Sequence, residues 1–348
     1  MRRATLILGV LGTVALLLAA ACGGGGTSTS APTTSTSAAS TQPTTAIYDP
    51  YEGTSPATTA TGSVVSGSLI TGDGRTRTYR LYVPSSVDGR SPMPLLVALH
   101  GGLGSAAQFA ANSGFEGLAE SNRFIVVFPD GIGALADGTA ARTWNGGYCC
   151  GAAARLEVDD VGFIRSLIDE VSRTHPVDPD RVVVSGHSNG AILAYRLACE
   201  LSDRIVAIGV QAGSLGVDTC TPPQPVSVFH LHGTADANHP VEGGKGSGPS
   251  GVEFHSAQAA IDTMVAADGC ASMPVDGVDP MNSAVHSTTW SSCRDGAAVR
   301  LVLVDGATHA WMGHPGQSPQ AAALVGDPYP DLDASRAIWS FLAAHPRS

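Results

Sequence analysis

Residues 181–195 read RVVVSGHSNGAILAY, and this stretch decides the fold. A β-branched strand pattern runs directly into a glycine-flanked turn and then into a helix pattern. Such a turn is so tight that Gly186 and Gly190 must lack side chains where the backbone crosses itself. Ser188 then stands at a helix start, where the helix dipole favours developing negative charge. The stretch predicts a nucleophilic serine, against the alternative of a glycine-rich turn without chemistry.

The surrounding sequence alternates strand and helix patterns. Apolar runs predict strands at Leu95–Leu99, Ile125–Phe128, Val182–Ser185, Ile205–Val210, Val226–Leu231 and Val299–Val304. Helix patterns cover Glu157–Arg173, Gly190–Leu201, Val252–Ala267 and Ala334–Ala344. Continuously apolar strands are covered on both faces, and this alternation is typical of a parallel sheet. We therefore expect one α/β domain over residues 63–348, with a mostly parallel central sheet and helices on both faces.

A serine hydroxyl needs a base and an acid that orients the base. Asp236 follows the strand pattern Val226–Leu231, and His309 follows Val299–Val304. The carboxyl ends of parallel strands share one edge of a sheet, and the order serine, acid, histidine suits this kind of turn. The sequence predicts the triad Ser188, Asp236 and His309, in preference to Glu242 as the acid and His314 as the base.

An oxyanion hole requires two backbone N–H groups aimed at one point. Asn189, the residue after the nucleophile, is expected to supply one of them. The other should come from the glycine-rich loop after Leu95–Leu99, where we choose Gly102 and keep Leu103 as the alternative. In the same loop, His100 is expected to brace the main chain.

The N-terminus has the pattern of an export signal. A basic start, Met1-Arg2-Arg3, precedes an uncharged apolar run from Ala4 to Ala21 and then Cys22. Residues 18–22, LAAAC, are similar to a bacterial lipobox, in which the cysteine is acylated. We expect a lipoprotein-type signal peptide over residues 1–21 and lipidation at Cys22, with a cleaved simple signal or an uncleaved anchor as alternatives.

Residues 22–62 are rich in Gly, Ser, Thr and Pro and are expected to form a disordered tether. The export signal and the tether together predict an extracellular location, either lipid-anchored at the outer face of the cell membrane or secreted.

The composition and the remaining charged clusters give no sign of a nucleic-acid or metal partner. The whole chain has 14% charged residues and a net charge of −11, which argues against a nucleic-acid partner. His230 and His232 lie on one strand face, and Asp159 and Asp160 stand at a helix start, and neither pair makes a metal-site pattern. We expect no metal, and helix capping by the two aspartates.

Six cysteines follow Cys22, and an even number in an exported domain predicts disulfides. Proximity favours Cys199–Cys220 and Cys270–Cys293. Cys149 and Cys150 then form either a vicinal pair or two bridges to different partners.

Several further motifs resemble those of the secreted polyhydroxybutyrate depolymerase and feruloyl esterase family of α/β-hydrolases. The resemblance covers about Leu69 to His345. It rests on these segments: His100-Gly101-Gly102, Phe128-Pro129-Asp130-Gly131, Trp144-Asn145, Cys149-Cys150, 158–163 (VDDVGF), the turn at Ser188, 232–236 (HGTAD) and His309-Ala310-Trp311.

The resemblance implies an α/β-hydrolase fold and ester hydrolysis through an acyl-enzyme at the same three residues, with no cofactor. The expected substrates are small or oligomeric esters of the hydroxybutyrate or feruloyl type. We expect Trp144, Asn145, His187 and Trp311 to contact the substrate, although Trp144 could equally be a core residue. Two alternatives remain: an acyltransferase or peptidase acting on the cell envelope, and a catalytically silent surface binding protein.

Overall fold

The computed structural model describes residues 46–134, 140–271, 273–314 and 319–347. Within these ranges, no helix has both the length and the apolar character needed to cross a membrane. The predicted signal peptide, Cys22 and most of the predicted tether lie outside the described residues.

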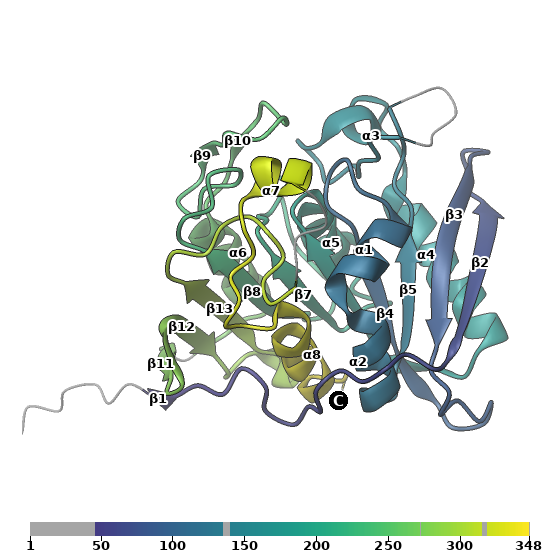
Figure 1. Cartoon of the computed structure of the whole chain (residues 1–348), viewed down its shortest axis with the longest axis horizontal. Helices are drawn as coiled ribbons and strands as arrows, with labels where there is room; N and C mark the ends of the chain where they lie inside the picture. The colour runs from purple at the N-terminus through teal and green to yellow at the C-terminus, as the bar shows by residue number, and fades with distance from the viewer. Residues whose placement is uncertain (1–45, 135–139, 272, 315–318, 348) are drawn as a thin grey trace, which may run out of the picture. The chain divides into compact units, whose positions relative to one another are not determined.

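A large mixed sheet forms the centre of the fold (Figure 1). Its strands are β1 (Ala46–Ile47), β2 (Ser63–Ile70), β3 (Thr76–Val83), β4 (Met93–Leu99), β5 (Ile125–Pro129), β6 (Val177–His187), β7 (Ala207–Gln211), β8 (Ser227–Gly233), β11 (Val275–Asp279), β12 (Asn282–Trp290) and β13 (Val299–Val304). Their order is β1-β11-β12-β13-β8-β7-β6-β4-β5-β3-β2. The central run from β13 to β5 is parallel. A separate antiparallel pair joins β9 (Gly244–Lys245) to β10 (Glu253–Phe254).

Helices cover both faces of this sheet. They are α1 (Ala106–Ser113), α2 (Phe115–Asn122), α3 (Gly151–Arg155), α4 (Asp160–Thr174), α5 (Asn189–Glu200), α6 (Ala257–Ala267), α7 (Pro319–Val325) and α8 (Ala334–Ala344), with a 3₁₀ turn at Arg294–Gly296. Helices α4, α5 and α6 pack on the face that carries Leu95 and Val97. Helices α1, α2 and α8 pack on the face that carries Leu96 and Ala98, in front of the sheet in Figure 1. Successive strand residues point to opposite faces, so a strand buried on both sides has to be continuously apolar.

The predicted fold class is therefore confirmed. Each expected strand and helix has a counterpart, and the ranges of β13 and α8 match the expected ones. The edge strands β2, β3, β11 and β12 were not expected. Their pairings with one another and with β5 and β13 are antiparallel, and β11 also pairs in parallel with the short β1, so these strands flank the parallel centre without altering it.

The predicted tether ends too late in the sequence. Tyr48 is only 5% exposed, and its N–H donates to the Val278 carbonyl oxygen, 3.1 Å away. The Thr58 N–H binds the Gly117 carbonyl oxygen, also at 3.1 Å. The polar composition of this segment suggested disorder, but its backbone groups pair with the folded domain and its tyrosine is buried. Residues 46–62 therefore belong to the folded unit, which corrects the boundary at residue 62.

Three disulfides link the six cysteines after Cys22. The structure contains Cys199–Cys220 and Cys270–Cys293, the two pairings that proximity favoured. Cys149 and Cys150 bond to each other. Of the two possibilities that the sequence left open for these neighbours, the structure has the vicinal pair.

Candidate active site

The turn after β6 holds Ser188 in an unusual backbone conformation. Strand β6 ends at His187 and helix α5 begins at Asn189, so Ser188 forms the whole connection, with φ 54° and ψ −119°. A Cβ atom on Gly186 would lie 2.4 Å from the Gly190 carbonyl oxygen. A Cβ atom on Gly190 would lie 2.5 Å from the Leu99 carbonyl oxygen. Only glycine fits at both positions, and the turn projects the serine hydroxyl from the sheet edge.

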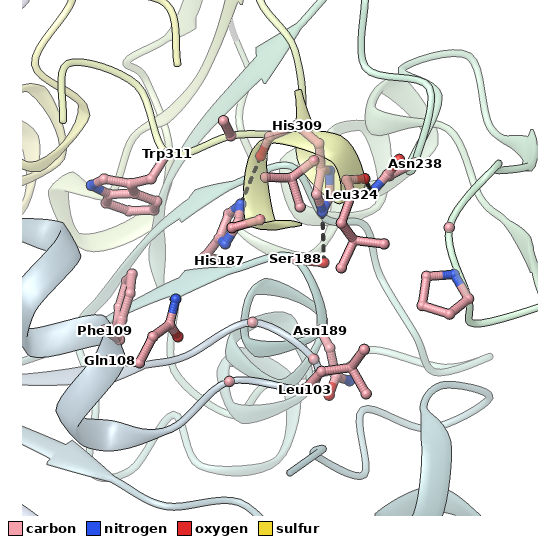
Figure 2. Close-up of a pocket in the computed structure, with 18 of the residues that line it drawn as sticks. Leu103, Gln108, Phe109, His187, Ser188, Asn189, Asn238, His309, Trp311 and Leu324 are labelled. Atoms are coloured by element: carbon pink, nitrogen blue, oxygen red, sulfur yellow. Dashed lines mark hydrogen bonds between the residues drawn. The ribbon is translucent and has the colours of Figure 1, made fainter. Parts of the chain in front are cut away.

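The three predicted triad residues meet at this edge. His309 Nε2 lies 2.9 Å from Ser188 Oγ, and His309 Nδ1 lies 2.7 Å from Asp236 Oδ2. The first of these contacts is the dashed line below His309 in Figure 2. The residues follow three parallel strands, β6, β8 and β13, whose carboxyl ends share one edge. The alternative base His314 instead hydrogen bonds to Asp333, at 3.1 Å.

Asp236 is held as an ionised acceptor. Its Oδ1 accepts hydrogen bonds from the backbone N–H groups of Asn238 and His239, each 2.9 Å long. Burial raises the pKa of the Asp236 carboxyl, but hydrogen bonds from His232 and His309 outweigh burial and hold the pKa well below its ordinary value. A carboxylate at Nδ1 requires the proton of His309 on that nitrogen. The Nε2 lone pair is then free to face the serine hydroxyl.

Two backbone N–H groups are available beside the nucleophile. A Cβ atom on Gly102 would lie 3.6 Å from Asn189 Cβ, so the glycine loop and the start of α5 are in contact. In the described ranges, neither the Gly102 N–H nor the Asn189 N–H donates to another residue. The Leu103 N–H is already bound to the Arg142 carbonyl oxygen, at 2.7 Å. The geometry therefore favours Gly102 over Leu103 as the partner of Asn189.

Ser188 and His309 line a pocket of about 590 Å³. Leu324 and Val325 of α7 form one wall, and Phe254 and Cys150 belong to another. Figure 2 shows Leu324 beside His309 and Ser188, with Leu103 across the opening. A pocket of this size encloses a ligand of moderate size, such as an aromatic or branched acyl group.

Two of the four predicted substrate contacts line this pocket. His187 lies next to Ser188, and its Nε2 is 2.8 Å from the main-chain oxygen of His309. Trp311 is 6% exposed, and its Nε1–H donates to Ser335 Oγ, 3.0 Å away. A hydrogen bond to a protein group therefore fixes each of these side chains in the pocket lining.

Trp144 and Asn145 do not line the pocket, and their predicted substrate contact is corrected. Trp144 is fully buried, and its Nε1–H donates to the His100 carbonyl oxygen at 2.9 Å. The Asn189 side chain pairs with both the N–H and the carbonyl of Trp144. The backbone N–H of Asn145 donates to Asp160. These residues hold the loop next to the nucleophile and lie outside the pocket lining.

The two aspartates at the start of α4 also differ from expectation. Asp159 caps the helix and accepts from the Gly162 N–H at 2.8 Å, as expected. Asp160 is fully buried and forms an ion pair with Arg77 at 2.6 Å. This aspartate is therefore an anchor for the loop at Asn145, and only its neighbour acts as the cap.

Two walls of the pocket were not predicted from the sequence. One is α7, whose residues carried no predicted element. The other is Phe254, which the sequence pattern placed inside a helix beginning at Val252. The helix begins at Ala257, because the Ser256 hydroxyl accepts from the Ala259 N–H and caps it. A serine followed by a helix pattern is a recognisable start signal, so Ser256 could have marked this boundary.

Comparisons with known proteins agree with this geometry. Residues 77–229 match the family described as Esterase PHB depolymerase, a span that includes Ser188 and ends before Asp236. Feruloyl esterase B of Piromyces equi is 29% identical over 234 residues, covering 65% of this chain and 41% of that protein. Poly(3-hydroxyalkanoate) depolymerase C of Paucimonas lemoignei is 30% identical over 132 residues, covering 38% of this chain and 30% of that protein. The chain thus spans less than half the length of these two relatives.

A solved structure shares the fold. The acetyl xylan esterase from Aspergillus awamori aligns with a TM-score of 0.50 and 16% identity, over 70% of this chain and 93% of that one. An identity this low speaks for the fold alone. Together with the topology described above, it shows an α/β-hydrolase fold in which residues 77–229 match the Esterase PHB depolymerase family model.

Proposed function

We propose that this chain hydrolyses carboxylic esters through an acyl-enzyme on Ser188. One observation carries the proposal: the hydrogen-bonded series from Asp236 through His309 to Ser188 ends at a pocket of about 590 Å³. A serine at its free pKa is a weak nucleophile, and this arrangement supplies the base and orients it.

The acylation step follows from the proton positions. His309 Nε2 removes the proton from Ser188 Oγ as the oxygen attacks the ester carbonyl carbon. Asp236 remains ionised and stabilises the imidazolium that forms. The carbonyl oxygen gains negative charge and is stabilised by the N–H groups of Gly102 and Asn189. The imidazolium then protonates the departing alcohol oxygen as the ester C–O bond breaks.

Deacylation uses the same groups in the same order. A water molecule replaces the alcohol, and His309 Nε2 takes its proton as the water oxygen attacks the acyl carbon. The tetrahedral intermediate collapses, Ser188 Oγ leaves, and the imidazolium returns the proton to it. The products are a carboxylic acid and the free enzyme.

We propose that the acyl group belongs to the feruloyl or hydroxyalkanoate class, and that the substrates are small or oligomeric. The pocket supports this substrate class because its walls include apolar side chains from α7, Phe254 and Trp311. The names of the two relatives, a feruloyl esterase and a poly(3-hydroxyalkanoate) depolymerase, give the same two acyl classes.

The test compares Ser188→Ala with Ser250→Ala, because Ser250 is another serine of the pocket wall. Purified variants are assayed with short p-nitrophenyl esters, methyl ferulate and 3-hydroxybutyrate oligomers, and are labelled with a fluorophosphonate probe. Ser188→Ala should lose both turnover and labelling with an unchanged melting curve, whereas Ser250→Ala keeps both. Retained turnover in folded Ser188→Ala would refute the nucleophile, and failure of the wild type on every ester would refute the function.

We also propose that the domain works outside the cytoplasm, attached to the membrane by a lipid on Cys22. Three disulfides support the oxidising location, because such bonds persist mainly in exported proteins. Labelling of expressing bacteria with a fatty-acid analogue should mark the wild type and leave Cys22→Ser unmarked and released from the membrane. Equal membrane association of the two proteins, with no label on either, would contradict the lipid anchor.

A further inference from the structure

A buried series of hydrogen bonds continues behind Asp236, away from the pocket. The Tyr195 hydroxyl of α5 lies 2.6 Å from His230 Nδ1, and His230 Nε2 lies 2.9 Å from His232 Nδ1. His232 Nε2 lies 2.8 Å from the His239 carbonyl oxygen and 3.5 Å from Asp236 Oδ2. The tyrosine and the two strand histidines are fully buried. The proposed mechanism gives none of these three side chains a role.

The acceptor end of the series fixes the position of one proton. A main-chain carbonyl and a carboxylate can only accept hydrogen bonds. His232 Nε2 faces both of these groups, so it must carry a proton. If His232 has one proton, its Nδ1 is an acceptor and receives the Nε2–H of His230. The Nδ1 of His230 is then an acceptor as well, and it receives the hydroxyl proton of Tyr195.

The opposite direction of these hydrogen bonds would leave the Tyr195 hydroxyl without an acceptor. A second proton on His232 Nδ1 would turn His230 around, so that its Nδ1–H donated to the tyrosine oxygen. The Tyr195 hydroxyl proton would then need another acceptor, and within the described residues His230 is its only hydrogen-bond partner. An unpaired buried donor is costly. Burial also raises the pKa of Tyr195 and lowers that of His230 well below its ordinary value, so the hydroxyl keeps its proton and His230 is neutral.

We propose that His232 is a positioning residue for Asp236, and that Tyr195 and His230 fix the tautomer of His232. In this tautomer the Nε2–H of His232 points at the turn from Asp236 to His239, which we call the acidic turn. The inference rests on the esterase function proposed above. It assigns no proton transfer to the series, and every group keeps its proton throughout the reaction.

The geometry gives His232 two effects on the carboxylate. Its stronger contact, to the His239 carbonyl oxygen, holds the end of the turn whose N–H groups bind Asp236 Oδ1. Its longer contact points the N–H dipole, with its partial positive charge on hydrogen, at Oδ2, the oxygen that also accepts from His309. The second donor lowers the basicity of Oδ2, and therefore limits how strongly the carboxylate favours the protonated form of His309.

The other titratable groups that face the triad would not obscure this effect. His187, at the end of β6, packs beside His309 with its ring tilted, and burial lowers its pKa to about 3. His239 packs against His232 from the acidic turn, and burial also holds its pKa well below the ordinary value. Both rings are neutral where the enzyme would be assayed, so the acid limb of kcat/KM reports the catalytic base.

The first experiment reads the tautomers without any turnover. Nitrogen-detected NMR of the ¹⁵N-histidine-labelled wild type at pH 8 should show that both His230 and His232 are protonated on Nε2 and unprotonated on Nδ1. Spectra of single His→Gln variants assign the signals. An Nδ1–H tautomer at either residue overturns the proposal even if the protein hydrolyses no ester. The result is thus independent of the proposed function.

The second experiment compares two replacements of the same imidazole. His232→Met removes the donor at similar volume, and His232→Gln keeps an N–H near the position of Nε2. In His232→Met we expect kcat/KM to fall about tenfold, the effect of one hydrogen bond to a charged group. We also expect the acid limb to move to higher pH by about 0.5 unit, because Asp236 then favours protonated His309 more strongly.

A control variant separates positioning from loss of packing. Phe229 lies on the opposite face of β8 and is fully buried, so Phe229→Leu disturbs the strand without touching the series. It should lower the melting temperature and leave the acid limb in place. The proposal is supported if only His232→Met moves the limb and His232→Gln restores it. It is overturned if the limb stays fixed or moves to lower pH in His232→Met, or if His232→Gln behaves like His232→Met.

Discussion

The imidazole of His187 donates its Nε2–H to the main-chain oxygen of His309, 2.8 Å away. The residue before the nucleophile therefore holds the backbone of the base. The direction of this bond is fixed because a carbonyl oxygen can only accept, so the Nε2 of His187 carries the proton. The bond ties the end of β6 to the loop after β13, two segments that have to stay in register for Ser188 and His309 to meet.

Removing this donor should loosen the base without changing the pocket entrance. His187→Leu keeps an apolar side chain of similar size but has no N–H, and we expect kcat/KM to fall about fivefold to tenfold, as for one neutral hydrogen bond. His187→Gln can still donate to the His309 carbonyl. Its decrease in log(kcat/KM) should be less than half of the decrease in His187→Leu. Steady-state kinetics with a short p-nitrophenyl ester measures both, and equal losses would show that the hydrogen bond is unimportant.

The oxyanion assignment can be tested at a backbone atom. Gly102→Pro removes the N–H proposed to bind the oxyanion, and kcat should fall about 10²- to 10³-fold, as when one such donor is lost. Gly102→Ala is the matched control, because its Cβ atom would make only an ordinary contact with Asn189, at 3.6 Å. Circular dichroism checks that both variants fold. Similar kcat values for the two variants would indicate that another residue of the loop supplies the N–H that binds the oxyanion.

The continuous apolar runs explain why the centre of the sheet could be predicted. A strand such as β4 is buried at every position and therefore has to consist of apolar residues. The triad could be predicted for a related reason, because parallel strands end at one edge and each triad residue directly follows a strand. Edge strand β2 was missed because one of its faces is exposed and its sequence, SVVSGSLI, mixes small and polar residues with apolar ones.

The roles of side chains in loops could not be predicted in the same way. Trp144 has the character of either a ligand contact or a core residue, and only the path of its loop decides between them. That path is set by the Asn189 side chain, which binds the tryptophan backbone from 45 positions further along the chain. His230 and His232 were likewise ambiguous, because their partner Tyr195 lies on a different element.

Stability should fall in mild acid because burial keeps four histidines in the neutral form. Burial lowers the pKa of His100 to about 4 and that of His187 to about 3, and holds those of His230 and His239 well below 6.5. The unfolded chain binds these four protons as the pH falls through about 6.5 and the folded chain does not, so the free energy of unfolding decreases by about 1.4 kcal/mol per pH unit for each histidine. Buried Asp268, with its pKa raised to about 7, has the opposite slope between about pH 4 and 7. Burial also raises the pKa of Asp160 above its ordinary value, and this carboxyl acts in the same direction as Asp268.

Four histidines against two carboxyls leave a net loss of stability between pH 6.5 and 4.5. Urea unfolding at several pH values measures it directly. His100→Gln should reduce the slope by about 1.4 kcal/mol per pH unit, since one of the four protons is then no longer taken up on unfolding. A midpoint that is constant or rises toward pH 4.5 would contradict the neutral state of these residues.

Trp144 and Phe254 offer a matched test of what shapes the pocket. Trp144 is fully buried beside the nucleophile and outside the pocket lining, whereas Phe254, 8% exposed, lies in the wall. Trp144→Phe should lower the free energy of unfolding by about 2–3 kcal/mol, through lost packing and the lost bond to the His100 carbonyl. The ratio of kcat/KM for feruloyl, acetyl and hydroxybutyryl esters should not change. Phe254→Leu should change that ratio with a smaller loss of stability, because it reshapes the surface that the acyl group meets. If the acyl preference followed the tryptophan and ignored the phenylalanine, the pocket used in catalysis would have to be a different one.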